Sequence, residues 1–541
     1  MKILLVEPNY KNKYPPIGLM KISTYHKNRG DEVIFYKGLL PPKELKQINR
    51  VYITSLFTFY FDKTVKTVAY YQKYFDNSNI YAGGIMVTIM PQKFREKVGN
   101  IHLLTGLLTD SSCLGLNDNI NIDTLPLDYS ILDECEYEYP AGDNYFSYTT
   151  RGCPNHCSFC AVPILEPAYS ITNNIKEQIT FTSKMYGDRR NLLLLDNNIF
   201  NLEIADLRKL TDDLKSIGFT KEPTYIRETL YERVIRYPKS KTSLRLLNKT
   251  ETFLRDFQKK IRNKNDQEIY ARFLTGVDAC QNKKIYFCGH KKQILPIIQK
   301  YKYKTKMKRY VDFNQGLEAG RITLPKMSIL SELPLRPVRI AFDHYTPSFV
   351  QKYINAINVS VSCGIKEFSN YMLYNYKDSP DDLWHRLKIN VDLANKLKIN
   401  IFSFPMKYMP ITETNRKYVG KYWNKKFLSS IHAILLVSKG IVADGESFFY
   451  RAFGKDCYEF KKILTMPKDF IIYRSFYEER GFTTQWENLY KLLDSSEKET
   501  LIKILSGSAP KTASTSNLSK ILKFYDNNYF YETIKRRDTQ L

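Results

Sequence analysis

Short strand-like runs alternate with amphipathic, helix-like runs along most of this chain, and this pattern constrains the fold more than any other feature. The first runs rich in β-branched and aromatic residues are Lys2–Val6, Glu32–Tyr36, Arg50–Thr54 and Asn79–Ala82. Helix-like stretches such as Gly18–Arg29 lie between them. Strands that alternate with helices favour a parallel sheet with helices on both faces. We therefore predict an N-terminal doubly wound α/β domain over residues 1–115 and a linker over residues 116–142.

The alternation resumes at Asp143. Six further strands are expected, at Tyr145–Thr150, Asn191–Leu195, Tyr310–Asn314, Val338–Phe342, Ser369–Asn375 and Asn400–Phe404. Helical patterns follow most of them, so the expected fold of residues 143–410 is a partial (βα)6 barrel. In such barrels the functional side chains lie at the carboxyl ends of the strands.

One interval interrupts the predicted barrel. Residues 219–308, about 90 in number, separate its second helix from its third strand, whereas such connections usually have about 2–6 residues. We interpret this interval as an inserted subdomain, with a helix-like stretch at Thr250–Arg262 and strand-like pieces at Ala271–Val277 and Lys284–Cys288. A helical C-terminal domain is expected over residues 411–505, and a flexible linker with a basic tail helix over residues 506–541.

Three cysteines stand close together directly after the first barrel strand. Cys153, Cys157 and Cys160 have the spacing C-x3-C-x2-C within the run Arg-Gly-Cys-Pro-Asn-His-Cys-Ser-Phe-Cys. Three thiolates on one loop can hold three corners of a cubic [4Fe-4S] cluster, which leaves the fourth iron without a protein ligand. An iron of that kind can bind a small molecule and pass an electron to it.

Two other interpretations of these cysteines are less well supported. A structural zinc site usually has four ligands in two pairs, and the sequence has no second pair; His156 between two of the cysteines would be a strained fourth ligand. A disulfide framework would leave one thiol over, because the chain has nine cysteines and the other six are scattered.

The cysteine spacing, the aromatic Phe159 before the last cysteine and the Arg-Gly-Cys-Pro lead-in resemble the radical S-adenosylmethionine (radical SAM) superfamily. The resemblance implies an enzyme that uses a [4Fe-4S] cluster to cleave S-adenosylmethionine reductively, giving a 5′-deoxyadenosyl radical that modifies a substrate. It also implies an electron donor such as flavodoxin or ferredoxin. Cys153, Cys157 and Cys160 would be the cluster ligands, and Phe159 would approach the adenine.

Further cofactor contacts are expected at the ends of later strands. Asp196 and Asn197 end the second barrel strand, Gln315 ends the third, and Asp343 ends the fourth. The alternative for each is ordinary capping and turn hydrogen bonding in a loop. No catalytic residue acting on the substrate is identified.

The N-terminal domain resembles that of cobalamin-binding radical SAM proteins. The resemblance rests on the Tyr-Pro-Pro-Ile-Gly-Leu turn from Tyr14 and on the Ala82-Gly83-Gly84 loop. The chain lacks the Asp-x-His-x-x-Gly run that supplies a histidine to cobalt, so both cobalamin binding and a domain kept for packing or partner contact stay open.

The positive charge of the chain is large and uneven. The net charge is +26, and Lys283–Arg309 holds ten Lys and Arg residues and no acidic residue. Because Tyr and Phe residues lie among these lysines, the stretch favours an RNA partner, tRNA above all: cations bind phosphates and rings stack on bases. The alternative substrate is a peptide, a protein or a small metabolite. With 43% hydrophobic residues but no long apolar run, the chain is expected to be cytoplasmic and not in a membrane.

Overall fold

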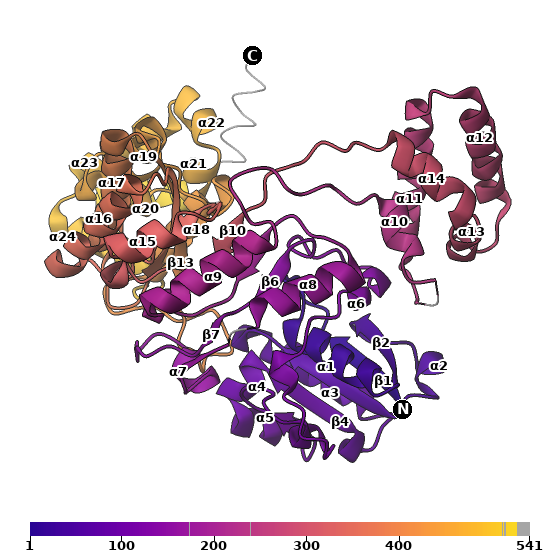
Figure 1. Ribbon diagram of the computed structural model, residues 1–541. Coiled ribbons are helices and arrows are strands. Elements are labelled where there is room, and N and C mark those ends of the chain that lie inside the picture. Colours follow the sequence, from indigo (N-terminus) through magenta and orange to yellow (C-terminus); the bar gives the residue numbers. More distant parts are fainter. Residues whose placement is uncertain (173, 239, 511, 513–514, 527–541) are drawn as a thin grey trace, which may run out of the picture. The chain divides into compact units, whose positions relative to one another are not determined.

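The computed structural model describes residues 1–172, 174–238, 240–510, 512 and 515–526 (Figure 1). The chain forms two compact units. Unit 1 contains Met1–Leu317, Thr323–Arg336 and Pro410–Arg416. Unit 2 contains Glu318–Ile322, Pro337–Met409 and the described residues from Lys417 onward. Both units are α/β, with parallel sheets and many helices.

Unit 1 begins with a five-stranded parallel sheet in the order β2-β1-β3-β4-β5. The strands are β1 (Lys2–Glu7), β2 (Glu32–Lys37), β3 (Arg50–Ser55), β4 (Ile80–Gly84) and β5 (His102–Leu104). The first four confirm the expected strands. The expected pattern had no fifth strand, because β5 has only three residues, of which one is buried.

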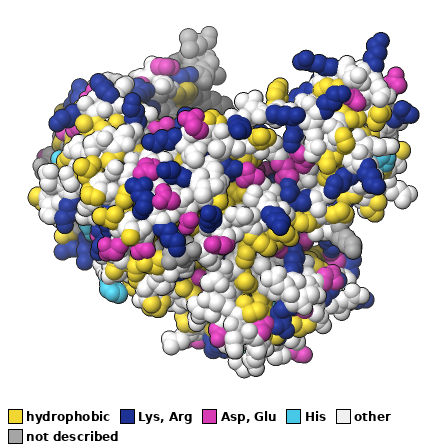
Figure 2. Space-filling model, viewed as in Figure 1, with side chains coloured by type: hydrophobic (Ala, Val, Ile, Leu, Met, Phe, Trp, Pro, Cys, Tyr) yellow, Lys and Arg dark blue, Asp and Glu magenta, His cyan; other side chains and the backbone are white. Residues whose placement is uncertain are grey.

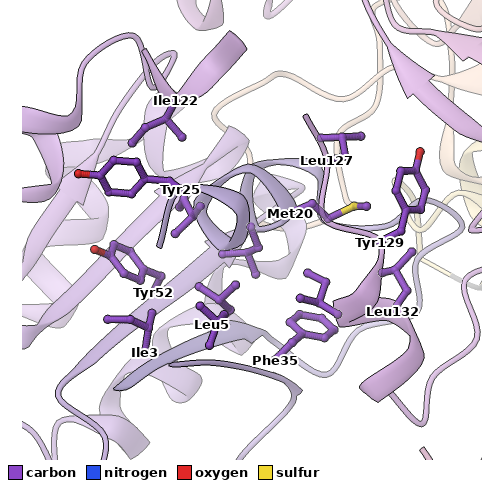
Figure 3. Close-up of a cluster of buried hydrophobic side chains, with 14 of the residues drawn as sticks. Ile3, Leu5, Met20, Tyr25, Phe35, Tyr52, Ile122, Leu127, Tyr129 and Leu132 are labelled. Atoms are coloured by element: carbon purple, nitrogen blue, oxygen red, sulfur yellow. The ribbon is translucent and has the colours of Figure 1, made fainter. Parts of the chain in front are cut away.

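Both faces of this sheet are buried. On one face Ile3 and Leu5 pack against helix α1 (Ile17–Asn28) and against apolar residues of the segment 114–141, such as Leu127 (Figure 3). On the other face Leu4 and Val6 belong to a core with α3 (Phe61–Tyr71) and α5 (Pro91–Val98). Successive side chains of a strand point to opposite faces, so a strand buried on both sides is a continuous apolar run. The segment 116–142 is therefore a covering layer of the sheet and not only a connector.

A second parallel sheet of unit 1 has the order β10-β9-β6. Its strands β6 (Tyr145–Ser147), β9 (Leu192–Leu194) and β10 (Val311–Phe313) lie within the first three strands expected for the barrel. Helices α8 (Ile175–Tyr186) and α9 (Ile204–Ser216) connect them. After β6 the chain makes a small antiparallel pair, β7 (Thr150–Arg151) with β8 (Ser170–Ile171).

The insertion is helical throughout its regular elements. It consists of α10 (Leu230–Ile235), α11 (Leu244–Phe257), α12 (Lys264–Ala279), α13 (Lys283–Gly289) and α14 (Lys291–Tyr301), around its own apolar core (Figure 1). The strands expected at Ala271–Val277 and Lys284–Cys288 are therefore wrong. The side chains of Asn263 and Asn282 cap α12 and α13, and Tyr270, Phe273, Leu274 and Val277 form one buried stripe at helical spacing.

Unit 2 contains the parallel sheet β11-β12-β13, with β11 (Val338–Arg339), β12 (Glu367–Tyr374) and β13 (Asn400–Lys407). Helices α16 (Pro347–Ser362) and α17 (Pro380–Leu397) connect these strands. All six expected strands thus exist, but as three-stranded sheets in different units. That these six strands together form one partial barrel stays a prediction.

The remainder of unit 2 is helical, as expected. Its helices are α18 (Lys425–Val437), α19 (Glu446–Phe453), α20 (Cys457–Thr465), α21 (Lys468–Ile472), α22 (Arg474–Glu479), α23 (Phe482–Leu492), α24 (Ser495–Leu505) and α25 (Ser516–Leu522). Most of the expected basic tail helix lies outside the described residues. No described helix is long and apolar enough to cross a membrane.

Candidate functional site

The cysteine loop follows β7 at the carboxyl edge of the second sheet. Cys153 and Cys160 are half-buried and Cys157 is exposed. The segments that follow β9 and β10 leave the same sheet at its carboxyl edge, because the three strands are parallel. The first three strand ends that the sequence singles out are thus on one edge.

Gly152, directly before the first cysteine, has a backbone conformation that requires glycine. Its φ is +70°, and a Cβ atom at this position would lie 2.4 Å from the carbonyl oxygen of Ala168. Its N–H donates a hydrogen bond of 2.6 Å to Oε2 of Glu166. The entry into the cysteine loop is therefore fixed by sterics on one side and by a carboxylate on the other.

Arg151 connects this carboxylate to a second one. Its Nη1 donates to Oε1 of Glu166 at 2.8 Å, and its Nε donates to Oδ2 of Asp123 at 3.0 Å. The guanidinium lies 3.3 Å from the ring centroid of Tyr148, a cation–π contact. Nζ of Lys21, on α1, donates to Oδ1 of Asp123 at 2.7 Å. This chain of alternating charges joins the N-terminal helix to the cysteine loop.

The electrostatics of the group follow from its burial. Burial lowers the pKa of Lys21 to about 7, although Asp123 opposes the change. Burial acts to raise the pKa of Asp123, but Lys21 and Arg151 outweigh it and the pKa is lowered. Asp123 is therefore the ionised centre of the network, and removing either cation would leave a charge poorly compensated in a buried place.

Asp196 anchors the residues that precede the loop. Its Oδ1 accepts hydrogen bonds from the backbone N–H of Thr149 (2.9 Å) and Thr150 (2.6 Å) and from both hydroxyls (2.7 and 2.8 Å). Burial raises the pKa of this carboxyl, and the threonine bonds oppose that change. Oδ2 is buried with no hydrogen-bond partner among the described residues. One oxygen is thus committed to positioning the chain, and the predicted cofactor contact is left to the other.

The sulfur atoms of the loop accept N–H groups. The backbone N–H of Asn155 donates to Sγ of Cys153 at 3.5 Å, and that of Val162 donates to Sγ of Cys160 at 3.5 Å. The side-chain amide of Asn198 lies 3.7 Å from Sγ of Cys153. Such hydrogen bonds stabilise thiolates and tune the potential of iron–sulfur clusters.

The donor set therefore fits an iron–sulfur cluster in its chemistry. Three thiols stand on one short loop, and two of their sulfur atoms accept N–H groups in the structure. Among the described residues, no three Cys, His, Asp or Glu side chains converge closely enough to hold a metal ion. Cluster binding would thus require the three cysteine side chains to turn toward one point.

The other predicted site residues occupy different settings. Nδ2 of Asn197 donates to Oε2 of Glu166 at 2.9 Å, so Asn197 belongs to the same network. Phe159 is half-buried in the loop, and Gln315 is exposed after β10. Asp343 follows β11 in unit 2, where burial raises its pKa to about 6 although Arg386 opposes the change. The structure brings Asp196 and Asn197 to the cysteine loop, whereas Asp343 belongs to the other unit.

Three residues of the network carry no recognisable signal in the sequence. Lys21 and Asp123 are 102 positions apart, and Glu166 lies in a loop that carries no recognisable pattern. Asp123 is one of several acidic residues of the linker, and only the folded chain distinguishes it from the others.

The glycine pair in the N-terminal domain is explained by strand packing. Gly84 has a φ of +97°, and a Cβ atom there would lie 2.3 Å from the carbonyl oxygen of Ser55 in β3. A Cβ atom on Gly83 would lie 2.9 Å from Cβ of Leu104 in β5. Each glycine thus allows β4 to approach a neighbouring strand, so the pair by itself is no indication of a cobalamin site.

The basic stretch Lys283–Arg309 is partly used inside the fold. Ion pairs join Lys283 to Glu251, Lys300 to Asp266, Lys302 to Glu232 and Arg309 to Asp188. Phe287 is fully buried, so the expectation that it is a surface ring for base stacking is wrong. Tyr303 is 75% exposed, and Lys304, Lys306 and Lys308 are exposed. Figure 2 shows the many Lys and Arg side chains over the insertion.

Comparisons with known proteins give only weak structural likenesses. No protein-family model matches the sequence, and no curated protein does. The chain is similar to the radical S-adenosylmethionine methyltransferase TsrM from Kitasatospora setae with cobalamin and a [4Fe-4S] cluster bound: TM-score 0.43, 12% identity, 76% of this chain and 77% of that chain. TsrM with its tryptophan substrate and the SAM analogue aza-SAM gives a TM-score of 0.38, 12% identity, and coverage of 76% and 75%. Such a likeness carries no conclusion about the site.

Proposed function

We propose that this chain is a radical SAM enzyme whose Cys153, Cys157 and Cys160 hold a [4Fe-4S] cluster. The observation that carries the proposal is the loop itself. Three thiols stand in the spacing C-x3-C-x2-C at the carboxyl edge of a parallel sheet, and two of their sulfur atoms accept N–H groups. The chemistry that such a cluster supplies when bound is a one-electron reduction of the sulfonium of S-adenosylmethionine.

Residues around the loop hold the backbone that leads into it. Asp196 holds Thr149 and Thr150, and Glu166 holds Gly152. Buried, charge-assisted hydrogen bonds of this kind fix the direction of the backbone before the first cysteine. Phe159 stands next to Cys160, where we propose that it contacts the adenine. We also propose cofactor contacts for Asp196, Asn197 and Gln315 of the same unit, and a contact by Asp343 of unit 2 stays a prediction.

The reaction is tested with anaerobically reconstituted protein, dithionite and S-adenosylmethionine. Mass spectrometry should detect methionine and 5′-deoxyadenosine in equal amounts. Cys157→Ala, which removes the most exposed of the three thiols, should abolish both products. Intact S-adenosylmethionine in the presence of a fully loaded cluster would refute reductive cleavage while leaving the cluster assignment standing.

Cobalamin is a separate proposal for the N-terminal domain. Its strand order, β2-β1-β3-β4-β5, is a doubly wound order in which ligands bind at the carboxyl edge between β1 and β3. Purified protein mixed with hydroxocobalamin should retain the pink cofactor through gel filtration if the domain binds it. A colourless protein peak would favour the alternative that the domain serves packing or partner contact.

RNA, tRNA above all, is the substrate that the exposed lysines favour. Lys304, Lys306 and Lys308 stand at alternate positions, and no acidic residue lies between them. Exposed cations in such a row suit a phosphate backbone. A peptide, a protein or a small metabolite is the alternative substrate. In that case the three lysines would bind an anionic group of that substrate. Binding of total tRNA at low salt separates the two proposals.

A further inference from the structure

An apolar cavity in the helical part of unit 2 belongs to no step proposed above. Its volume is about 270 Å³. Nine of its lining residues are apolar, among them Ile434, Val437, Ala452, Met466 and Phe470. The other three are Arg451, Arg474 and Ser475. A concave apolar site with a few convergent polar groups is the usual form of a small-molecule site.

The polar residues of the cavity form one group. Nη2 of Arg451 lies 2.9 Å from Oε2 of Glu478 and 3.3 Å from Oγ of Ser475, and Nε of Arg474 lies 2.7 Å from Oε1 of Glu478. Two guanidinium groups thus share one carboxylate, so the group carries a net charge of +1. These hydrogen bonds use Nη2 of Arg451 and Nε of Arg474, and the other guanidinium N–H groups are further donors for an anion.

Burial divides the cavity into a floor and a mouth. Ile434, Met466 and Phe470 are at most 4% exposed, and they form the floor. The Arg451 side chain is 55% exposed, and Val437 is 54% exposed, which places both at the mouth. The cationic group therefore meets solvent, while the apolar walls extend inward.

We propose that this cavity binds a carboxylate with an unbranched apolar tail, of which a medium-chain fatty acid is the simplest form. The tail fills the floor formed by α18, α20 and α21, where each buried methylene contributes about 0.8 kcal/mol. The carboxylate lies at the mouth and accepts hydrogen bonds from Arg451 and Arg474, a geometry that guanidinium groups favour. The volume, slightly below the usual range of about 300–1,000 Å³, suits a tail of moderate length.

The experiment is calorimetric titration of the full chain with decanoate, below its aggregation concentration, and with 1-decanol as the uncharged partner. Decanoate should bind at least about tenfold more tightly than 1-decanol, because charge-assisted hydrogen bonds are lost with the alcohol. Octanoate, shorter by two methylenes, should bind about 15-fold more weakly than decanoate. Equal affinity for the acid and the alcohol, or no binding of decanoate, would overturn the proposal.

Three variants locate the ligand. Ala452→Phe should abolish binding of decanoate by filling the cavity. Arg451→Gln together with Arg474→Gln should weaken the binding of decanoate at least about tenfold and leave the binding of 1-decanol unchanged. Glu478→Gln should strengthen decanoate binding, since it removes the carboxylate that competes for both guanidinium groups; a misfolded variant would not gain affinity. Lys491→Gln, on the exposed surface of α23, is the matched control and should bind normally. Decanoate binding that survives Ala452→Phe, or that weakens in Glu478→Gln, would contradict the assignment.

Discussion

The carboxylate of Glu166 accepts the backbone N–H of Gly152 at 2.6 Å, one residue before the first cysteine of the loop. The same carboxylate accepts hydrogen bonds from the guanidinium group of Arg151 at 2.8 Å and from the side-chain amide of Asn197 at 2.9 Å. One side chain therefore joins the backbone before Cys153, the cation that leads to Asp123 and the segment after β9. We infer that Glu166 is the main positioning residue of the cysteine loop.

Replacing Glu166 should weaken cluster binding in a graded way. Glu166→Ala removes all three contacts and should lower cluster retention about 10–100-fold, the usual effect of losing a partner that supports metal ligands. Glu166→Gln can keep the bond to Gly152 but turns an amide toward Arg151, so its loss should be smaller. Iron content after gel filtration measures both. Equal retention by Glu166→Ala and the wild type would show that the loop needs no such support.

Gly152→Ala should prevent the loop from forming. The added Cβ would lie 2.4 Å from a backbone oxygen, and the φ of +70° is unfavourable for alanine. The variant should lose its cluster while circular dichroism and gel filtration stay normal. Gly18→Ala is the matched control, because a Cβ there meets no atom within 4 Å. A Gly152→Ala protein that carries a full cluster would contradict the geometry described for the loop.

The exposed lysines should account for part of any RNA affinity. Changing Lys304, Lys306 and Lys308 to Gln removes up to three phosphate contacts, so the slope of log affinity against log salt should fall by about 2, at roughly 0.7 per contact. Lys302→Gln should change the slope little, because Lys302 is paired with Glu232 at 2.7 Å. An unchanged slope in the triple variant, or a wild type without affinity for tRNA at low salt, would favour the peptide or metabolite alternative.

Lys426 should give unit 2 a pH-dependent stability. Burial lowers the pKa of its ammonium group from 10.5 to about 7, and the group donates to Ser430 and to the carbonyl oxygens of Leu464 and Met466. Between about pH 7 and 10.5 the unfolded state binds more protons than the folded state, so stability rises with pH across this window. Lys426→Met should remove that rise. Urea unfolding at pH 7 and pH 9.5 measures this change in the free energy of unfolding. An equal change in the wild type and in Lys426→Met would refute the lowered pKa.

The strands and the cysteine loop could be predicted because their signals are local. Leu4 and Val6 alternate with Ile3 and Leu5 in a continuous apolar run, which favours a strand buried on both faces. The three cysteines lie within eight residues of one another, so their joint role is visible in the sequence alone.

The supporting contacts could not be predicted because they join distant parts of the chain. Asp123 meets Lys21 and Arg151 only after α1, the linker and the second sheet have packed. The insertion shows a different difficulty. Ala271–Val277 has the aromatic and branched residues of a strand, but its buried residues recur at helical spacing, and this tertiary packing decides the outcome.

The central claim is that Cys153, Cys157 and Cys160 together hold one cubic cluster, and the iron and sulfide content of the reconstituted protein tests it most directly. The wild type should contain about four irons and four sulfides per chain, as one such cluster requires. A variant with Cys113, Cys280 and Cys363 changed to Ala should contain the same, because these cysteines stand apart from the loop. Changing Cys153, Cys157 and Cys160 to Ala should remove both iron and sulfide. A cluster that persists in this last variant, or that disappears with the three distant cysteines, would contradict the account.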